Sequence, residues 1–81
     1  MIFYLNLSSC YLNMKEYKSA ICACNEAILI DDKNFKAYFR RAKARVDNII
    51  SGNSYFFIDV TELVLASNDL KLAISLSNNN H

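Results

Sequence analysis

One feature of the 81-residue chain restricts its fold more than any other: a pattern of large and small residues occurs twice at a fixed distance. The pattern begins at Tyr4 and again at Tyr38, 34 residues later. The two copies of its first half are Tyr4-x2-Leu7-Ser8-x2-Tyr11 and Tyr38-x2-Arg41-Ala42-x2-Arg45. The two copies of its second half are Ala20-x3-Cys24-x2-Ala27 and Ala66-x3-Leu70-x2-Ala73. A repeat of this length indicates helical units that stack on one another.

Four helices are predicted within the two units. Apolar residues recur at three- and four-residue spacings, and the chain has no Pro and one Gly. The predicted helices cover residues 2–14, 17–30, 35–47 and 58–76. Lys15-Glu16 is a polar break between the first two helices. Asn34 or Asp32 is expected to accept hydrogen bonds from the free N–H groups that open the third helix.

Each helix is expected to bury one stripe of side chains. The stripe of the first helix contains Phe3, Leu7, Cys10 or Tyr11, and Met14. The stripe of the second contains Ala20, Ile21, Cys24, Ala27, Ile28 and Leu29. The stripe of the fourth contains Val60, Leu63 or Val64, Ser67, Leu70 and Ile74. Small residues should allow the helices to approach closely, and they are Ser8, Ala20, Ala27, Ala42, Ala66 and Ala73.

This period and this placement of small residues resemble the tetratricopeptide (TPR) repeat. The resemblance implies an all-α fold of antiparallel helix-turn-helix repeats, an α-solenoid with two repeats. Repeat one covers residues 1–34, repeat two covers residues 35–78, and residues 79–81 form a polar tail. Solenoids usually need three or more repeats, so the chain resembles part of a longer array. We expect it to self-associate, by pairing of its edges or by exchange of a helix.

The second unit contains an insertion at about residues 48–58. The two halves of the pattern begin 16 residues apart in the first unit and 28 residues apart in the second. Gly52 and Asn53 indicate a turn within the insertion, and Asp59-x-x-Glu62 resembles a capping pair that opens the last helix. The insertion is too apolar for a purely solvated loop. It could extend both helices, pack back onto the repeats as a lid, or bind a ligand.

Charge and cysteine content exclude several functional classes. Nine basic and eight acidic residues give a net charge of +1, which argues against a globally basic nucleic-acid binder. Cys10, Cys22 and Cys24 are odd in number and lack metal-ligand spacing, so we expect buried thiols in a reducing compartment. No apolar run approaches the ~20 residues of a membrane span. We therefore expect a cytoplasmic protein that is not an enzyme and has no metal or cofactor.

The first helix of each stacked TPR unit lines a concave groove, where residues that are not needed for packing contact the ligand. In this chain those residues are Asn6, Ser9, Lys36, Phe39, Arg40 and Lys43. Lys36, Arg40 and Lys43 follow i, i+4, i+7 spacing, which places three cations on one helix face. This arrangement favours an acidic ligand.

Two segments carry a more specific resemblance. They are Asn6-Leu7-x2-Cys10-Tyr11-Leu12 and Lys36-Ala37-x2-Arg40-Arg41-x2-Ala44. Their residues and separation resemble the carboxyl-terminal TPR region of FKBP-type immunophilins and of their aryl-hydrocarbon-receptor-interacting relatives. The resemblance covers residues 4–46 well and residues 62–78 more weakly.

That resemblance implies a co-chaperone module that binds the acidic C-terminal tail of a cytosolic heat-shock chaperone in a carboxylate clamp. Asn6 would donate to the terminal carboxylate, and Lys36 and Arg40 would bind carboxylate oxygens. Ser9, Phe39 and Lys43 would line the rest of the groove. In the family a further Lys and Asn come from a preceding repeat, and a prolyl-isomerase domain, if the protein has one, lies outside these residues.

Two alternatives remain open. The chain could be a TPR scaffold for another partner, or could self-associate through the insertion, without a clamp. It could also bind RNA or phosphate through Arg40, Arg41, Lys43 and Arg45. Against the second alternative, Tyr38 and Phe39, the aromatic residues that could stack on RNA bases, are expected to serve packing or the groove. The stems of Arg41 and Arg45 are expected to cover neighbouring apolar surface.

Overall fold

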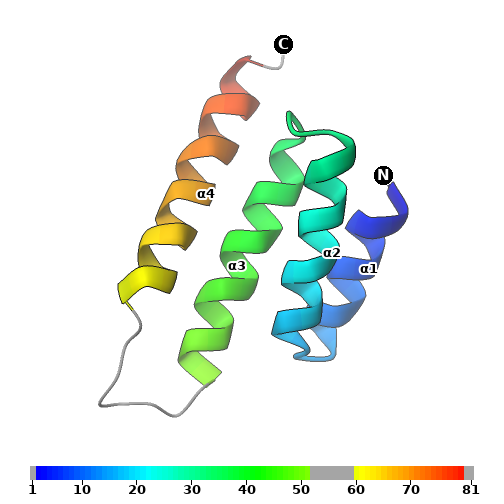
Figure 1. Cartoon of the computed structure of the whole chain (residues 1–81), viewed down its shortest axis with the longest axis vertical. Coiled ribbons are helices and arrows are strands. Elements are labelled where there is room, and N and C mark those ends of the chain that lie inside the picture. The colour runs from blue at the N-terminus through cyan, green and yellow to red at the C-terminus, as the bar shows by residue number, and fades with distance from the viewer. Residues whose placement is uncertain (1, 52–59, 80–81) are drawn as a thin grey trace.

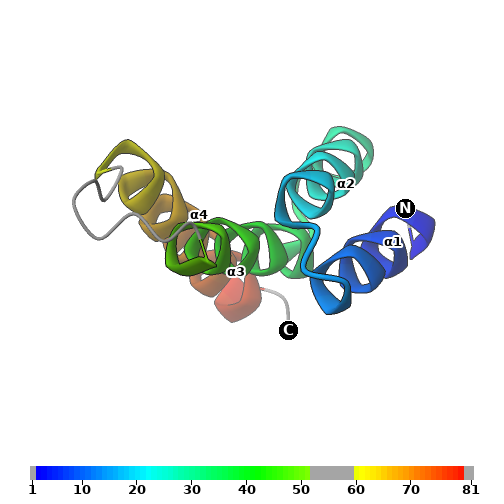
Figure 2. The same ribbon diagram turned by 90° about the horizontal axis from the view of Figure 1, so that it is seen from below.

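The computed structural model of the chain describes residues 2–51 and 60–79, which form four α-helices and, within those ranges, no strand. The helices are α1 (Ile2–Asn13), α2 (Tyr17–Ile30), α3 (Phe35–Ser51) and α4 (Val60–Asn79). Successive helices run in opposite directions, and α3 lies between α4 and the α1–α2 pair (Figures 1 and 2). The predicted all-α fold of antiparallel helix-turn-helix repeats is therefore confirmed.

The turn between α1 and α2 ends the first helix without a glycine. Lys15 has a left-handed φ of 61°. The Glu16 N–H donates to the Tyr11 carbonyl at 2.8 Å, and the Lys15 N–H donates to the Leu12 carbonyl at 3.1 Å. These two bonds form a Schellman motif, in which glycine is usual at the left-handed position because a Cβ atom disfavours that backbone conformation. The predicted polar break at Lys15-Glu16 is confirmed.

The turn between α2 and α3 is fixed by side chains at both of its ends. The Asn34 Oδ1 accepts the Lys36 N–H at 3.0 Å, so Asn34 is the residue that caps α3. Asp32, the alternative cap, instead presents its backbone carbonyl to the Tyr38 hydroxyl at 2.8 Å. These bonds hold the first turn of α3, which carries Lys36, in a defined orientation.

Small residues occupy the places where the helices cross. All six residues predicted to allow close approach are buried, at 5% exposure or less: Ser8, Ala20, Ala27, Ala42, Ala66 and Ala73. Ala37 and Ala44 on α3 are buried as well. The Ser8 hydroxyl donates to the Leu5 carbonyl at 2.7 Å, so its burial leaves no unpaired polar group.

The predicted stripe of α1 is largely wrong as a description of what this helix buries. Phe3 is 67% exposed and Met14 is 60% exposed, whereas Leu5 and Ser8 are buried. The face of α1 that packs against α2 and α3 therefore does not carry Phe3 and Met14, which lie on the exposed face of the helix. On α2, Leu29 is also exposed rather than buried.

The predicted stripe of α4 is wrong in the same way. Val60 and Ile74 are both more than half exposed, and the buried residues of this helix are Ala66, Asp69 and Ala73. The physical reason is that α4 packs against α3 alone among the described helices. A helix with a single neighbour buries only a narrow stripe.

The helix boundaries differ from the predicted ones around the insertion. α3 continues to Ser51, beyond its predicted end at Asp47, so the first residues of the insertion extend this helix. α4 continues to Asn79, beyond the predicted Leu76. The expected turn at Gly52-Asn53 and the start of the predicted capping pair lie outside the described residues.

The cysteines do not all behave as small core residues. Cys24 is fully buried as predicted, and burial raises the pKa of its thiol above the ordinary value of 9.0. Cys10 and Cys22 are exposed, so the prediction of burial is wrong for these two, and all three thiols are free. None of the helices in residues 2–51 and 60–79 combines the length and the apolarity that crossing a bilayer requires.

Candidate functional site

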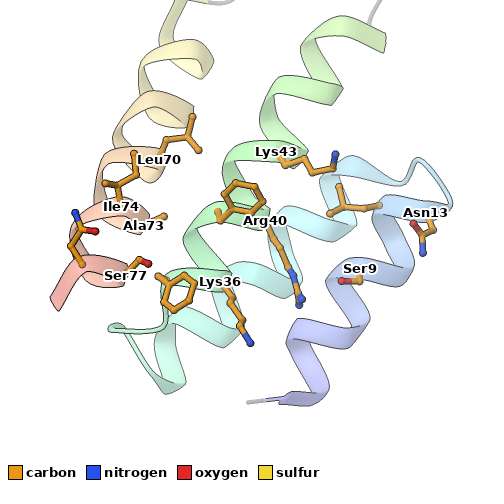
Figure 3. A pocket seen from close by; sticks show the side chains of 13 residues that line it. Ser9, Asn13, Lys36, Arg40, Lys43, Leu70, Ala73, Ile74 and Ser77 are labelled. Carbon is orange, nitrogen blue, oxygen red and sulfur yellow. The ribbon is translucent and has the colours of Figure 1, made fainter. Parts of the chain in front are cut away.

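A groove of about 800 Å³ runs along one face of α3, between α1 and α4. Figure 3 shows Ser9 and Asn13 on its α1 side, Lys36, Arg40 and Lys43 on α3, and Leu70, Ala73, Ile74 and Ser77 on its α4 side. The lining residues are Ser9, Leu12, Asn13, Phe35, Lys36, Phe39, Arg40, Lys43, Leu70, Ala73, Ile74, Ser77 and Asn78.

The groove is positively charged. Lys36, Arg40 and Lys43 lie at successive turns of α3 and point to the same side of the helix, toward α1 (Figure 3). None of the described residues that line the groove is acidic. Like charges at these spacings repel one another slightly when nothing opposite in charge faces them. An anionic ligand would remove that repulsion.

Arg40 is held in place before any ligand arrives. Its Nη1 donates to the Leu5 carbonyl of α1 at 2.8 Å, so the side chain bridges from α3 to α1. A guanidinium carries five N–H donors, and this bond uses one of them. The remaining donors stay near a fixed position at the edge of the groove, so binding a carboxylate there would cost less side-chain entropy than ordering a free arginine.

The opposite wall of the groove is apolar. Leu70, Ala73 and Ile74 of α4 line it together with Phe35 and Phe39 of α3. Phe39 is 54% exposed and Ile74 is 61% exposed, although both are large apolar residues. A surface that combines exposed cations with an exposed apolar wall is suited to a partner that is both acidic and apolar.

The structure brings together most of the residues predicted for the site. Ser9, Lys36, Phe39, Arg40 and Lys43 all line the groove. Asn6 is exposed on α1 and does not line it. Because the Arg40 guanidinium bonds to the Leu5 carbonyl, it nevertheless lies at the turn of α1 that contains Asn6.

A second set of cations on α3 has a different environment, which the sequence reading missed. Arg41 makes two parallel bonds to the Asp69 carboxylate, at 2.9 Å from Nε and 2.6 Å from Nη2. The Arg45 Nη1 donates to the same carboxylate at 2.7 Å. Arg41 also donates to the Asn25 side chain of α2 at 2.9 Å, so this ion cluster joins three helices.

The ion cluster is charge-compensated, because Arg45 also pairs with the Glu62 carboxylate at 3.6 Å, and most of it is hidden from water. The Asp69 side chain is 4% exposed, and those of Arg41 and Arg45 are 18% and 14% exposed. The hydrogen bond to Asp69 raises the pKa of Arg41 above its ordinary value. Because Arg41 and Arg45 are paired in this way, they do not join Arg40 and Lys43 in one basic surface of the kind considered for RNA.

One signal in the sequence pointed to the ion cluster. Asp69 lies between Ala66 and Ala73 on the buried stripe of α4, and a charge in that position requires a partner. Arg41 stands where the TPR pattern usually has an apolar residue. Together, a carboxylate on a buried stripe and an arginine at an apolar position predict an ion pair between α4 and α3.

The described residues offer no group of His, Cys, Asp and Glu side chains that could hold a metal ion. No protein-family model and no solved structure matches the chain. Curated proteins do match part of it. The peptidyl-prolyl cis-trans isomerase FKBP42 of Arabidopsis thaliana is 41% identical over 44 residues, 54% of this chain and 12% of that protein.

Two further relatives give similar values. The human peptidyl-prolyl cis-trans isomerase FKBP4 is 40% identical over 43 residues, 53% of this chain and 9% of that protein. The Hsp70/Hsp90 co-chaperone CNS1 of Saccharomyces cerevisiae is 42% identical over 41 residues, 51% of this chain and 11% of that protein. The chain thus spans about a tenth of the length of these relatives. Over about half of its own length, it resembles FKBP-type isomerases and an Hsp70/Hsp90 co-chaperone.

Proposed function

We propose that the chain is a protein-interaction module of a cytoplasmic co-chaperone, and that its groove binds the acidic C-terminal tail of a heat-shock chaperone. The observation that supports this most is the cationic side of the groove, which is formed by Lys36, Arg40 and Lys43, because no described residue that lines the groove is acidic. A short acidic peptide is the ligand whose charge complements this surface.

The proposed clamp uses each cation differently. Arg40, already anchored to α1, presents its remaining donors to a carboxylate as a planar fork. Lys36 and Lys43 are exposed and supply mobile point charges to either side of it. Asn6, on the same turn of α1 as the Arg40 contact, would donate its amide to the terminal carboxylate. The apolar wall would hold an aliphatic side chain of the peptide.

The relatives support the same reading. One of them is named as an Hsp70/Hsp90 co-chaperone, and the others are named as prolyl isomerases. Any isomerase activity of the full-length protein would belong to residues outside this chain. The module itself would contribute binding.

Charge-assisted hydrogen bonds contribute roughly 1.5–3 kcal/mol each. Three such bonds, reduced by the entropy lost when a flexible peptide becomes ordered, give a micromolar-class interaction. Such an affinity suits an adaptor that exchanges partners.

The test is a fluorescence-polarisation titration with a labelled peptide that ends in Glu-Glu-Val-Asp. We expect saturable binding that is weakened at least tenfold when the peptide C-terminus is amidated, and by a similar factor in Arg40→Ala, which corresponds to about 1.4 kcal/mol. The matched control is Lys71→Ala, which removes the same charge from an exposed position of α4 outside the groove. Equal binding of the free and amidated peptides would contradict the clamp.

A further inference from the structure

Two apolar stripes on the outer helices are not covered by another helix within the described part of the chain. On α4, Leu70 is 38% exposed and Ile74 is 61% exposed; on α1, Phe3 is 67% exposed and Cys10 is exposed too. The internal repeat indicates what such stripes pack against. Each stripe corresponds, one repeat away, to a face of α2 or α3, and that face is covered by a neighbouring helix.

The stripe on α4 corresponds to a face of α2. Aligning the second half of the pattern places Leu70 at the position of Cys24, and Ile74 at that of Ile28. Cys24 is fully buried, and Ile28 packs against the core cluster that contains Ala37 of α3. In repeat one this face is therefore covered by the helix that begins the next unit.

The stripe on α1 corresponds to a face of α3. Aligning the first half of the pattern places Phe3 at the position of Ala37, and Cys10 at that of Ala44. Both alanines are 0% exposed. The exposed stripes of α1 and α4 are therefore counterparts of the two sides of the buried contact between α2 and α3.

From this correspondence we infer that the chain associates head to tail, with α1 of a second copy packed on α4 as α3 packs on α2. Within one chain, Ala37 forms a buried cluster with Leu5 and Ala27, and Ile28 packs against this cluster. The three residues that surround Ala37 in this way are therefore Leu5, Ala27 and Ile28. One repeat later these three positions are Phe39, Ala73 and Ile74, which form the apolar wall of the groove.

Phe3 of the second copy is the residue that corresponds to Ala37 and would cover this wall. Phe3 and Phe39 are larger than their counterparts Ala37 and Leu5. The joining helix would therefore lie further from α3 than α3 lies from α1.

Such a contact is heterologous, because it joins two different surfaces. Each added copy exposes a new α4, so the assembly grows as a linear series rather than closing as a dimer. The cationic side of the groove remains available, since Arg40 bonds to α1 of its own copy. The inference therefore leaves the cationic contacts of the proposed function in place, and an added copy would compete only with the aliphatic side chain of the peptide for the apolar wall.

The test is sedimentation velocity of the wild-type chain and of variants across micromolar to submillimolar concentrations. We expect the wild type to show a series of species whose mean mass rises with concentration. Phe3→Glu and Ile74→Glu should each be monomeric, because a buried unpaired carboxylate would disrupt the contact. The matched control is Leu29→Glu, at an apolar position of α2 that is 80% exposed and belongs to neither stripe. It should assemble like the wild type.

Mixing the two disrupted variants tests the direction of the contact. Phe3→Glu retains an intact α4 stripe and Ile74→Glu retains an intact α1 stripe, so an equimolar mixture should form dimers and nothing larger. A wild type that stays monomeric would overturn the inference, as would Phe3→Glu that still self-associates or a mixture that stays monomeric.

Far-UV circular dichroism checks that each variant is folded. If Phe3→Glu is not folded, Phe3→Ser takes its place; if Ile74→Glu is not folded, Ile74→Ser takes its place. In addition, Phe3→Glu, whose substitution lies on α1 outside the groove, should retain binding at the cationic side, measured as the charge-dependent difference between free and amidated acidic peptides. Loss of assembly with that difference kept separates this contact from the peptide site.

Discussion

The two sides of α3 carry the same kinds of residue and use them in opposite ways. On one side, Arg41 and Arg45 share the Asp69 carboxylate of α4. On the other, Lys36, Arg40 and Lys43 line a groove in which no described residue is acidic. Arg40 and Arg41 are neighbours in sequence, but one helical step of about 100° sends their side chains to different surroundings.

In a helical repeat, the groups around a cation show whether it stabilises the packing or is available for a ligand. A cation that faces a buried carboxylate contributes to packing, and its removal leaves an uncompensated buried charge. A cation that has no carboxylate partner contributes less to stability and is available for a ligand. The surroundings, rather than the residue type, separate the ion cluster from the groove.

The largest expected effect is that of Asp69→Ala. It leaves two arginines without their shared partner, so the free energy of unfolding should fall by about 3 kcal/mol, measured by urea denaturation. Lys36→Ala, on the groove side, should change it by no more than about 0.5 kcal/mol. Glu26→Ala, which removes an exposed carboxylate of α2, controls for the change in net charge. A loss of stability below about 1 kcal/mol for Asp69→Ala would contradict the proposed difference between the ion cluster and the groove.

Stability and peptide affinity, both measured for variants of Arg40 and of Arg41, should separate the two adjacent arginines. Arg41→Ala should lower the free energy of unfolding by about 2 kcal/mol, because it removes charge-assisted bonds to Asp69. Its affinity for the acidic peptide should match that of the wild type, measured well below its denaturation midpoint. Arg40→Ala should show the reverse order of effects, with a stability loss of about 1 kcal/mol from the bond to Leu5 and a larger loss of affinity.

Salt should lower the affinity of the groove for the peptide and leave the stability provided by the ion cluster nearly unchanged. Raising the ionic strength from about 0.05 M to about 0.5 M shortens the screening length to a few ångströms and should weaken peptide binding several-fold. The free energy of unfolding should change by less than about 0.5 kcal/mol, because buried pairs such as Arg41 and Asp69 are screened much less. Isothermal titration calorimetry and urea denaturation at both ionic strengths measure the two quantities. Equal sensitivity of both would show that the ion cluster is open to solvent.

The smallest effect concerns Cys24, which is buried on α2, outside the groove. Burial raises its pKa in the folded state, so its contribution to stability is present below the ordinary thiol pKa of 9.0 and is lost as the pH rises through the folded value. Denaturation midpoints between pH 8 and pH 10.5 should therefore fall more steeply for the wild type than for Cys24→Ala. Parallel slopes for the two proteins would contradict burial of the Cys24 thiol.

The sequence was sufficient to predict the fold and much of the groove. The 34-residue repeat predicts which helices are paired, and the small residues in the repeated pattern, such as Ala20 and Ala27, lie buried at the helix contacts as expected. Spacing alone placed Lys36, Arg40 and Lys43 on one face. Whether these residues bind an acidic tail stays a prediction.

What the sequence reading missed depends on which neighbours each helix has. Hydrophobic periodicity finds an apolar stripe but does not show whether another helix covers it, and this is why Phe3 and Ile74 were expected to be buried. The ion cluster was missed because Arg41 and Asp69 are 28 residues apart in sequence and meet only when α4 returns along α3. The left-handed turn at Lys15 carries no glycine to mark it.

Binding of the acidic peptide by Arg40 can be followed through the arginine Nε–H signals in ¹H–¹⁵N spectra during a titration. We expect the Arg40 signal to shift progressively and to saturate, whereas the signals of Arg41 and Arg45, held by Asp69, stay in place. Saturable binding that moves Arg41 or Arg45 and leaves Arg40 unchanged would show that the peptide does not bind at Arg40.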